Sequence, residues 1–195
     1  MKKTFLLFLL FLTFAIKAQE RAKSPANDTL PVFFIGGGTG INNACGLLGI
    51  YTSFRASDNL YLRAGFGFGS WGRKFTGGFK YELKALNSWA FGLSYSSCSG
   101  KNNYKANLEV QDSVVKVKQV TLDLFRTSTI NLTVSYKWVF QHKNIFFVDM
   151  GYSIPVEYEP YLVKDGSVLT RGGKTTLRNL QPGGVILGLG LLFGL

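Results

Sequence analysis

Residues 183–195 read GGVILGLGLLFGL and carry no charged or hydrogen-bonding side chain. Most of the large side chains stand at odd positions, with Ile186 and Leu192 as exceptions, and most of the glycines stand at even positions. As a helix the stretch is too short to cross a bilayer, which takes about 20 residues, whereas a tilted strand needs only about 9–11. The alternation therefore predicts a β-strand with one large apolar face and one slim glycine face.

The same period of two recurs through much of the chain. It is clearest in residues 60–68, 89–95, 130–140 and 146–154. One face of each segment is aromatic or aliphatic, and the other carries Gly, Ser, Thr and isolated charges. A soluble β-sandwich has the opposite sense, with its charges outside. The pattern is that of a membrane barrel, whose lipid-facing surface is apolar and whose narrow interior is polar.

Eight segments of this kind predict an all-β fold, and no stretch of helical period follows the N-terminal residues. The expected form is an eight-stranded antiparallel transmembrane up-and-down β-barrel, with extended extracellular hairpins from strands 5–6 and 7–8. The short connections would face the periplasm, because short turns lie on that side of outer-membrane barrels. The expected strands are residues 31–41, 46–56, 60–70, 75–86, 88–98, 127–141, 145–156 and 183–195.

The N-terminal residues predict export. Lys2 and Lys3 precede a short apolar run, so residues 1–18 are interpreted as a signal peptide. Residues 19–29 are polar and would form a flexible periplasmic leader, and residues 30–195 would form the barrel domain. The formal net charge of +11 favours anionic lipid or surface polysaccharide over nucleic acid as the partner of an exported protein.

With these features the chain resembles the small eight-stranded outer-membrane β-barrel proteins of Gram-negative bacteria, the OmpX-, OmpA- and OmpW-like group. The resemblance covers residues 30–195. It rests on the signal peptide, the eight alternating segments, the asymmetry of turns and loops, and the stretch GGVILGLGLLFGL. It departs from the family at Leu195, where the family usually has an aromatic residue. The resemblance implies a monomer in the outer membrane and transfers no catalytic motif.

Two long connections keep the alternating pattern. Residues 120–124 share their parity with residues 130–140, and Asp165-Gly166 is a strong hairpin signal. One interpretation is a single protruding sheet continuous with the barrel strands, which the family resemblance supports, and whose open edge could add a strand from a partner protein. The other is a pair of independent mobile hairpins.

Charged side chains with interior parity should pair with one another, because an unpaired buried charge is very costly. We expect a structural ion-pair network, with a gate or binding site as the alternative. The inward glycines could also leave a slim cavity for one small apolar ligand. The predicted lumen residues are Arg63, Lys80, Glu82, Lys84, Lys137 and Asp149.

The sequence predicts no enzyme, metal or cofactor. The one histidine, His142, falls in a short turn on the predicted periplasmic side, away from where a His–Ser site at the outer leaflet would lie. Cys45 and Cys98 both fall near the outer ends of strands. They could form a disulfide there, or they could be two small buried side chains without a bond. Basic residues that would face lipopolysaccharide phosphates are Arg73, Lys74, Lys101, Lys105, Lys116, Lys118, Arg171, Lys174 and Arg178.

The function expected from the sequence is therefore non-enzymatic: an integral outer-membrane barrel protein with a structural or surface-binding role carried by its extracellular hairpins. Two alternatives stay open. One is an accessory component of an envelope transport or secretion machine, and the other is a narrow carrier of small apolar ligands.

Overall fold

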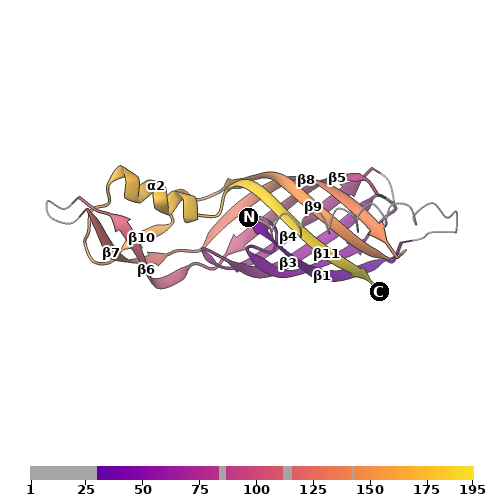
Figure 1. Cartoon of the computed structure of the whole chain (residues 1–195), viewed down its shortest axis with the longest axis horizontal. Coiled ribbons are helices and arrows are strands. Elements are labelled where there is room, and N and C mark those ends of the chain that lie inside the picture. The colour runs from indigo at the N-terminus through magenta and orange to yellow at the C-terminus, as the bar shows by residue number, and fades with distance from the viewer. Residues whose placement is uncertain (1–29, 84–86, 112–115, 142) are drawn as a thin grey trace, which may run out of the picture.

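The computed structural model describes residues 30–83, 87–111, 116–141 and 143–195. The expected signal peptide (residues 1–18) and leader (residues 19–29) lie outside the described residues, as do Lys84 and His142. Figure 1 shows a barrel with a smaller unit beyond one of its ends. The barrel strands are β1 (Phe33–Ile41), β2 (Leu48–Arg55), β3 (Leu60–Gly69), β4 (Gly72–Glu82), β5 (Trp89–Cys98), β8 (Thr127–Phe140), β9 (Asn144–Pro155) and β11 (Gly184–Gly194).

These eight strands form a closed antiparallel barrel in the order β1-β2-β3-β4-β5-β8-β9-β11. The predicted eight-stranded antiparallel barrel is thus confirmed. Strand β11 closes the barrel by pairing with β1, from Gly194 opposite Phe34 to Leu187 opposite Ile41. Its odd-numbered side chains are exposed, whereas Ile186 is buried in the lumen. The glycines of the C-terminal strand therefore belong to the inner face.

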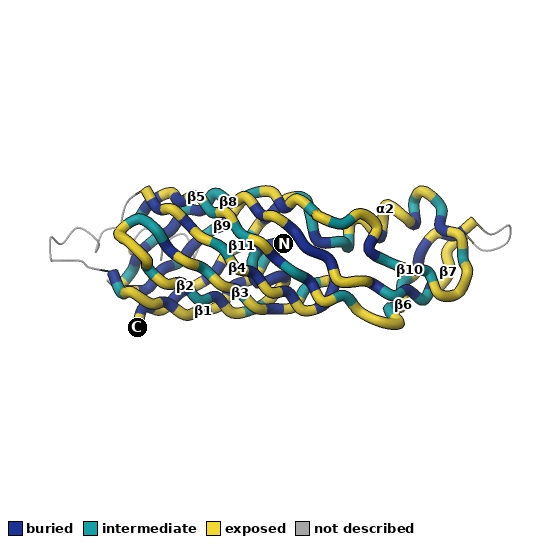
Figure 2. The backbone as a smooth tube through the Cα atoms, turned by 180° about the vertical axis from the view of Figure 1, so that it is seen from behind, coloured by how far each residue is buried: buried dark blue, intermediate teal, exposed yellow. Residues whose placement is uncertain are grey.

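The outer surface of the barrel is apolar on every strand, and Figure 2 shows exposed and buried residues alternating along them. Aromatic rings gather at both ends of this surface. At the end with the short β8–β9 connection, which we call the turn end, Tyr136 contacts Trp89 and Trp138 with ring centroids 5.0 and 4.6 Å apart. Toward the opposite end, the loop end, Phe66 contacts Phe68 and Phe75 at 5.7 and 4.8 Å.

The unit beyond the loop end, which we call the cap, is a three-stranded sheet with one helix. Its strands are β6 (Lys101–Glu109), β7 (Val117–Leu124) and β10 (Tyr161–Val163), in the order β10-β7-β6. Helix α2 (Arg171–Leu180) lies against the sheet. Among the described residues, no helix is long and apolar enough to cross a membrane.

Helix α2 corrects the expectation that no helix follows the N-terminal residues. Only Gly173 and Leu177 are buried in it, so there is no apolar stripe from which a helical period could be read. The helix begins at Thr170, whose Oγ1 accepts a hydrogen bond from the Gly173 N–H at 3.2 Å. Two glycines in its first turn are poor helix formers, so contacts with the rest of the cap hold it.

The two long connections take an arrangement that neither sequence interpretation described. They meet in one sheet, because β10 pairs with β7, but this sheet is separate from the barrel. The chain turns out of β7 at Phe125, whose N–H donates to the carbonyl of Pro160 at 2.7 Å. The cap is therefore a small folded unit built from two segments far apart in the sequence.

The barrel has a hydrophobic core in its interior. A second hydrophobic core, between the cap and the barrel, fixes the cap in place. Trp71, from the turn between β3 and β4, is 1% exposed within it, and its Nε1 donates to the carbonyl of Phe125 at 2.9 Å. Ser70 Oγ donates to the carbonyl of Leu180 at 2.8 Å, at the end of α2. The core comprises Trp71, Cys98, Leu108, Val110, Val120, Leu122, Leu124, Leu169 and Leu177.

Candidate functional site

The lumen is filled at the loop end by the chain itself. Residues 42–47, which connect β1 and β2 and are here called the inner loop, fold into the barrel. Asn43 and Cys45 are buried, and Asn43 Oδ1 accepts a hydrogen bond from the Cys45 N–H at 3.0 Å. The Leu47 N–H donates to the carbonyl of Phe68 on β3 at 2.7 Å. The inner loop thus plugs the mouth of the barrel beneath the cap.

The inward glycines make room for this loop. A Cβ atom on Gly67 would lie 1.9 Å from the Cys45 carbonyl oxygen, and one on Gly65 would lie 2.8 Å from that of Ala44. On the facing strand, a Cβ on Gly188 would lie 2.9 Å from Asn43 Cβ. The space that the sequence suggested for a small apolar ligand is therefore taken by residues 43–45. In the sequence, alternating glycines indicate strands with a slim inner face, but they do not show what fills the lumen.

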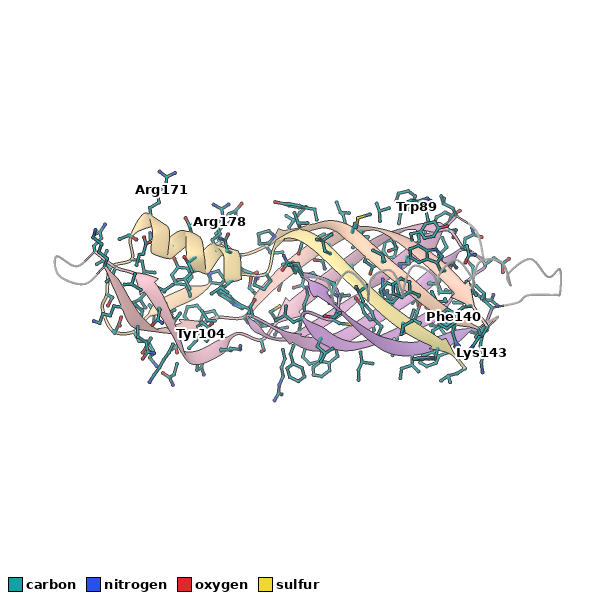
Figure 3. All side chains as sticks on the ribbon, viewed as in Figure 1. Trp89, Tyr104, Phe140, Lys143, Arg171 and Arg178 are labelled. Atoms are coloured by element: carbon teal, nitrogen blue, oxygen red, sulfur yellow. The ribbon has the colours of Figure 1, made fainter. Side chains whose placement is uncertain are left out.

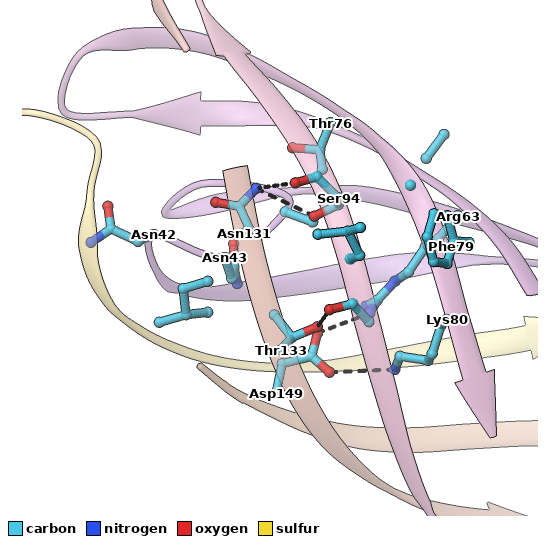
Figure 4. Close-up of a pocket in the computed structure, with 16 residues that line it drawn as sticks. Asn42, Asn43, Arg63, Thr76, Phe79, Lys80, Ser94, Asn131, Thr133 and Asp149 are labelled. Atoms are coloured by element: carbon cyan, nitrogen blue, oxygen red, sulfur yellow. Dashed lines mark hydrogen bonds and ion pairs between the residues drawn. The ribbon is translucent and has the colours of Figure 1, made fainter. Parts of the chain in front are cut away.

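Below the inner loop, a carboxylate and two cations meet in the lumen (Figure 4). Asp149 Oδ2 accepts from Arg63 Nη1 at 2.9 Å, and Asp149 Oδ1 lies 3.4 Å from Lys80 Nζ. Ser135 Oγ donates to the same Oδ1 at 2.5 Å. The Arg63 guanidinium also lies over the rings of Tyr51 and Phe147, at 4.2 and 4.6 Å from their centroids. Aromatic faces and a carboxylate together compensate its charge.

A second ion pair joins Lys137 Nζ to Glu82 Oε2. Both side chains are buried, and the Lys137 ammonium lies 5.5 Å from the centroid of the Tyr61 ring. The lumen residues predicted from parity are thus brought together in two groups, with Arg63, Lys80 and Asp149 in one and Glu82 and Lys137 in the other. The sixth, Lys84, lies outside the described residues.

A hydroxyl and amide network, which the sequence analysis did not single out, occupies the lumen beside the first group. Asn131 Nδ2 donates to Ser96 Oγ at 2.8 Å, and Ser153 Oγ donates to Asn131 Oδ1 at 2.6 Å. Thr76 and Ser96 share a hydrogen bond of 2.7 Å. The inward parity of these residues was visible in the sequence and could have identified them. These side chains satisfy one another's hydrogen-bond donors and acceptors in a closed interior.

Two small cavities remain in the lumen, each of about 20 Å³. A volume of this size holds about one water molecule. Arg63 and Lys80 line both cavities, so their side chains separate the two. These two cavities therefore have room for isolated waters and not for a ligand of several atoms.

The cysteines decide between two alternatives, because the structure has both Cys45 and Cys98 as free, buried thiols and no disulfide between them. They belong to two different cores. Cys45 lies in the barrel core, where its Sγ donates to the carbonyl of Ile50 at 3.2 Å. Cys98 packs in the cap core with Trp71. Cys45 and Cys98 are therefore two small buried side chains, the second of the two alternatives that the sequence left open.

Lys74 corrects a second expectation, because it does not face the exterior. Its side chain is buried, and its Nζ donates to the carbonyl of Asn42 at 3.0 Å. Lys74 shares the even parity of Lys80 and Glu82 on β4, so the parity rule could have placed it inside. Its proximity to the loop end led to the wrong assignment.

The remaining basic residues of the predicted outer set are all exposed at the loop end or on the cap. They divide into one residue on β4, four on or beside the β6–β7 hairpin, and three on helix α2. They are Arg73, Lys101, Lys105, Lys116, Lys118, Arg171, Lys174 and Arg178.

No cluster of His, Cys, Asp and Glu that could hold a metal ion occurs in the described ranges. Comparison with known proteins gave no match to a family model and none to a curated protein. The candidate sites are therefore defined by geometry alone: the polar lumen of the barrel and the exposed basic residues of the cap.

Proposed function

We propose that the protein is an integral outer-membrane β-barrel without enzymatic activity, which holds the cap outside the cell as a binding surface. The observation that carries the proposal is the inverted distribution of side chains. The outer wall exposes large apolar residues on every strand, whereas ion pairs lie inside. A contiguous apolar surface of this extent needs a partner, and a closed barrel is the form in which strands can face lipid.

The aromatic rings support a position across the membrane, and the short connections support its orientation. Interfacial Trp and Tyr side chains mark the two headgroup regions of outer-membrane barrels. Trp89, Tyr136 and Trp138 gather at the turn end, and Figure 3 places Trp89 and Phe140 there. With the turn end in the periplasm, the cap faces the exterior of a Gram-negative cell.

The filled lumen favours binding over transport. The inner loop, the Arg63–Asp149 pair and the Lys137–Glu82 pair occupy it at successive positions. A carrier of small apolar ligands would need an apolar path, and the two small cavities are lined in part by charged side chains. The cap, in contrast, carries exposed basic side chains on helix α2 and on the β6–β7 hairpin.

The edge of the cap sheet formed by β6 favours a protein as a partner of the cap. At the tip, the edge of β6 is covered, because the Thr170 N–H donates to the Glu109 carbonyl at 3.1 Å. Antiparallel pairing with β7 turns alternate backbone groups of β6 outward, and no hydrogen bond among the described residues occupies those of Lys105 and Asn107. An extended segment of a partner protein can add to an edge of this kind.

The proposal is tested with the full chain and a variant that lacks residues 104–121, both expressed in a Gram-negative host. Both proteins should fractionate with the outer membrane and migrate on gels in a heat-dependent way, as closed barrels do. Only the full chain should retain native envelope partners after mild detergent extraction. Fractionation outside the outer membrane, or identical partners for both proteins, would overturn the proposal.

A further inference from the structure

Helix α2 carries a row of cations along its exposed face. Arg171, Lys174 and Arg178 stand at spacings of three and four residues. At about 100° per residue they fall within about 60° of arc and extend over about 10 Å of helix axis. Figure 3 shows Arg171 and Arg178 pointing away from the sheet beneath the helix. We call this row the α2 cation face.

The opposite side of the helix is committed to the cap core. Gly173 and Leu177 are buried there. A Cβ on Gly173 would lie 2.4 Å from the Glu109 carbonyl oxygen, so the helix approaches β6 as closely as its backbone allows. The helix therefore has a fixed orientation, and the cation face cannot rotate into the cap.

Glu109, the acid that contacts the start of the helix, is held by Thr170. Glu109 Oε2 accepts a hydrogen bond from Thr170 Oγ1 at 3.1 Å, at the first turn of the helix. A carboxylate at that end interacts favourably with the helix dipole. The described ion pairs of the protein do not include Arg171, Lys174 or Arg178. The three cations thus lie close together without an acid between them.

Helix stability explains only one member of the row, because Arg178 stands in the last turn, where the helix dipole favours a cation. Arg171 and Lys174 lie in the first half of the helix, and like charges three and four residues apart repel one another. The helix also has two glycines and two threonines among its first six residues, all poor helix formers. Arg171 and Lys174 therefore oppose helix formation where the sequence is weakest, which points to a ligand that compensates the charge.

The position of the helix indicates which ligand it meets. The helix begins at the far side of the cap and ends at the barrel mouth, where Ser70 Oγ binds the Leu180 carbonyl. Arg178 is therefore nearest to the level at which the apolar wall of the barrel ends. In a membrane, that level is occupied by the headgroups of the outer leaflet.

We propose that the α2 cation face binds the phosphate groups of phosphorylated glycolipid headgroups in the leaflet around the barrel. This inference rests on the proposed location in the outer membrane. Guanidinium groups bind phosphate in a bidentate manner, and ammonium groups add charge-assisted hydrogen bonds. The row along the helix axis matches a headgroup that carries several phosphates and rises from the bilayer.

The test compares two variants with the same loss of charge. The first is Arg171→Gln/Lys174→Gln/Arg178→Gln, and the second is Lys105→Gln/Lys116→Gln/Lys118→Gln on the β6–β7 hairpin. Binding of the full chain, refolded in detergent micelles, is measured with purified lipopolysaccharide and with the same material after enzymatic dephosphorylation. Heat-dependent migration and resistance of the cap to protease show that each variant is folded.

The first variant should bind phosphorylated lipopolysaccharide about tenfold more weakly than the unmodified protein, and the second should bind almost as well as the unmodified protein. Equal losses in both variants would show a diffuse charge effect and overturn the inference. So would equal affinity for the dephosphorylated material, or tighter binding of a single-stranded oligonucleotide.

The assay in micelles does not depend on where the protein resides in the cell. An outer-membrane protein that fails the binding assay contradicts the inference alone. A protein that binds but fractionates elsewhere contradicts the proposed function.

Discussion

Arg63 on β3 and Asp149 on β9 join opposite walls of the barrel through a contact of 2.9 Å between Nη1 and Oδ2. Their side chains are only 11% and 3% exposed. A pair buried to this degree is close to neutral as a pair, but the loss of one partner leaves an uncompensated charge. The contact therefore makes the barrel depend on both residues.

Asp149→Asn should destabilise the barrel by about 3–5 kcal/mol, because Arg63 and Lys80 then lose their carboxylate. The measurement is urea unfolding of the protein refolded in lipid vesicles. As a control, Lys164→Gln removes the more exposed ion pair with Asp123 and should cost less than about 1 kcal/mol. Similar losses in the two variants would contradict a dependence on burial.

Gly67→Ala should displace the inner loop, because the new Cβ would lie 1.9 Å from the Cys45 carbonyl oxygen. Overpacking of this kind costs about 1–3 kcal/mol. The displacement is read as faster alkylation of the Cys45 thiol by a maleimide, in a Cys98→Ala background. Gly77→Ala is the matched control, since a Cβ at Gly77 meets no atom within 4 Å. If Cys45 reacts at the same rate in both variants, the inner loop does not depend on Gly67.

Trp71→Ala should loosen the cap and leave the barrel closed. The substitution removes a side chain that is 1% exposed, together with its hydrogen bond to the Phe125 carbonyl. Truncation of a buried Trp costs about 3–5 kcal/mol. Trypsin should then cut at Lys101 and Lys105, while migration on gels remains heat-dependent. Trp89→Ala, on the exposed barrel wall, should leave the cap resistant, and a resistant cap in both variants would refute the role of Trp71.

The carboxyl of Asp123 in the cap should titrate at unusually low pH. The backbone N–H of Asn103 donates to it at 2.8 Å, and Lys164 Nζ lies 3.3 Å from it. The amide hydrogen bond first, and the ammonium second, lower the pKa of Asp123 below its ordinary value of 3.8. Since the folded pKa is depressed, this stabilisation is complete above the unfolded pKa and is lost as pH falls through the folded one.

The measurement for Asp123 is the chemical shift of the Asn103 amide proton between pH 2 and pH 6, a range of about two units on either side of the ordinary pKa. The midpoint should lie below 3.8, and the transition should disappear in Asp123→Asn. A midpoint at or above the ordinary value would show that the two contacts do not hold the carboxylate.

The sequence predicted the barrel well because the contrast between its wall and its lumen is imposed at every second residue. The expected strand at residues 60–70 is observed as Leu60–Gly69, and the one at 145–156 as Asn144–Pro155. The same parity placed Arg63 and Asp149 in the interior, where they meet. Period and charge were sufficient for this part of the molecule.

The inner loop and the cap could not be predicted in the same way. The expected strands left only residues 42–45 as a short connection, whereas residues 42–47 connect β1 and β2, and only the closed barrel shows that this loop lies within it. In the cap, Trp71 packs in one core with residues that range from Cys98 to Leu177. The α2 helix buries two side chains and so has no apolar period. Each of these features depends on contacts between distant segments, which local patterns do not encode.

The cap is completed only when two separate segments of the chain come together. Its first strands lie between β5 and β8, and β10 and α2 lie between β9 and β11. The first segment cannot complete the core alone, because Leu169 and Leu177 follow β8 and β9 in the chain. A cap that resists protease therefore reports that both segments, and the strands that carry them, have come together in one molecule.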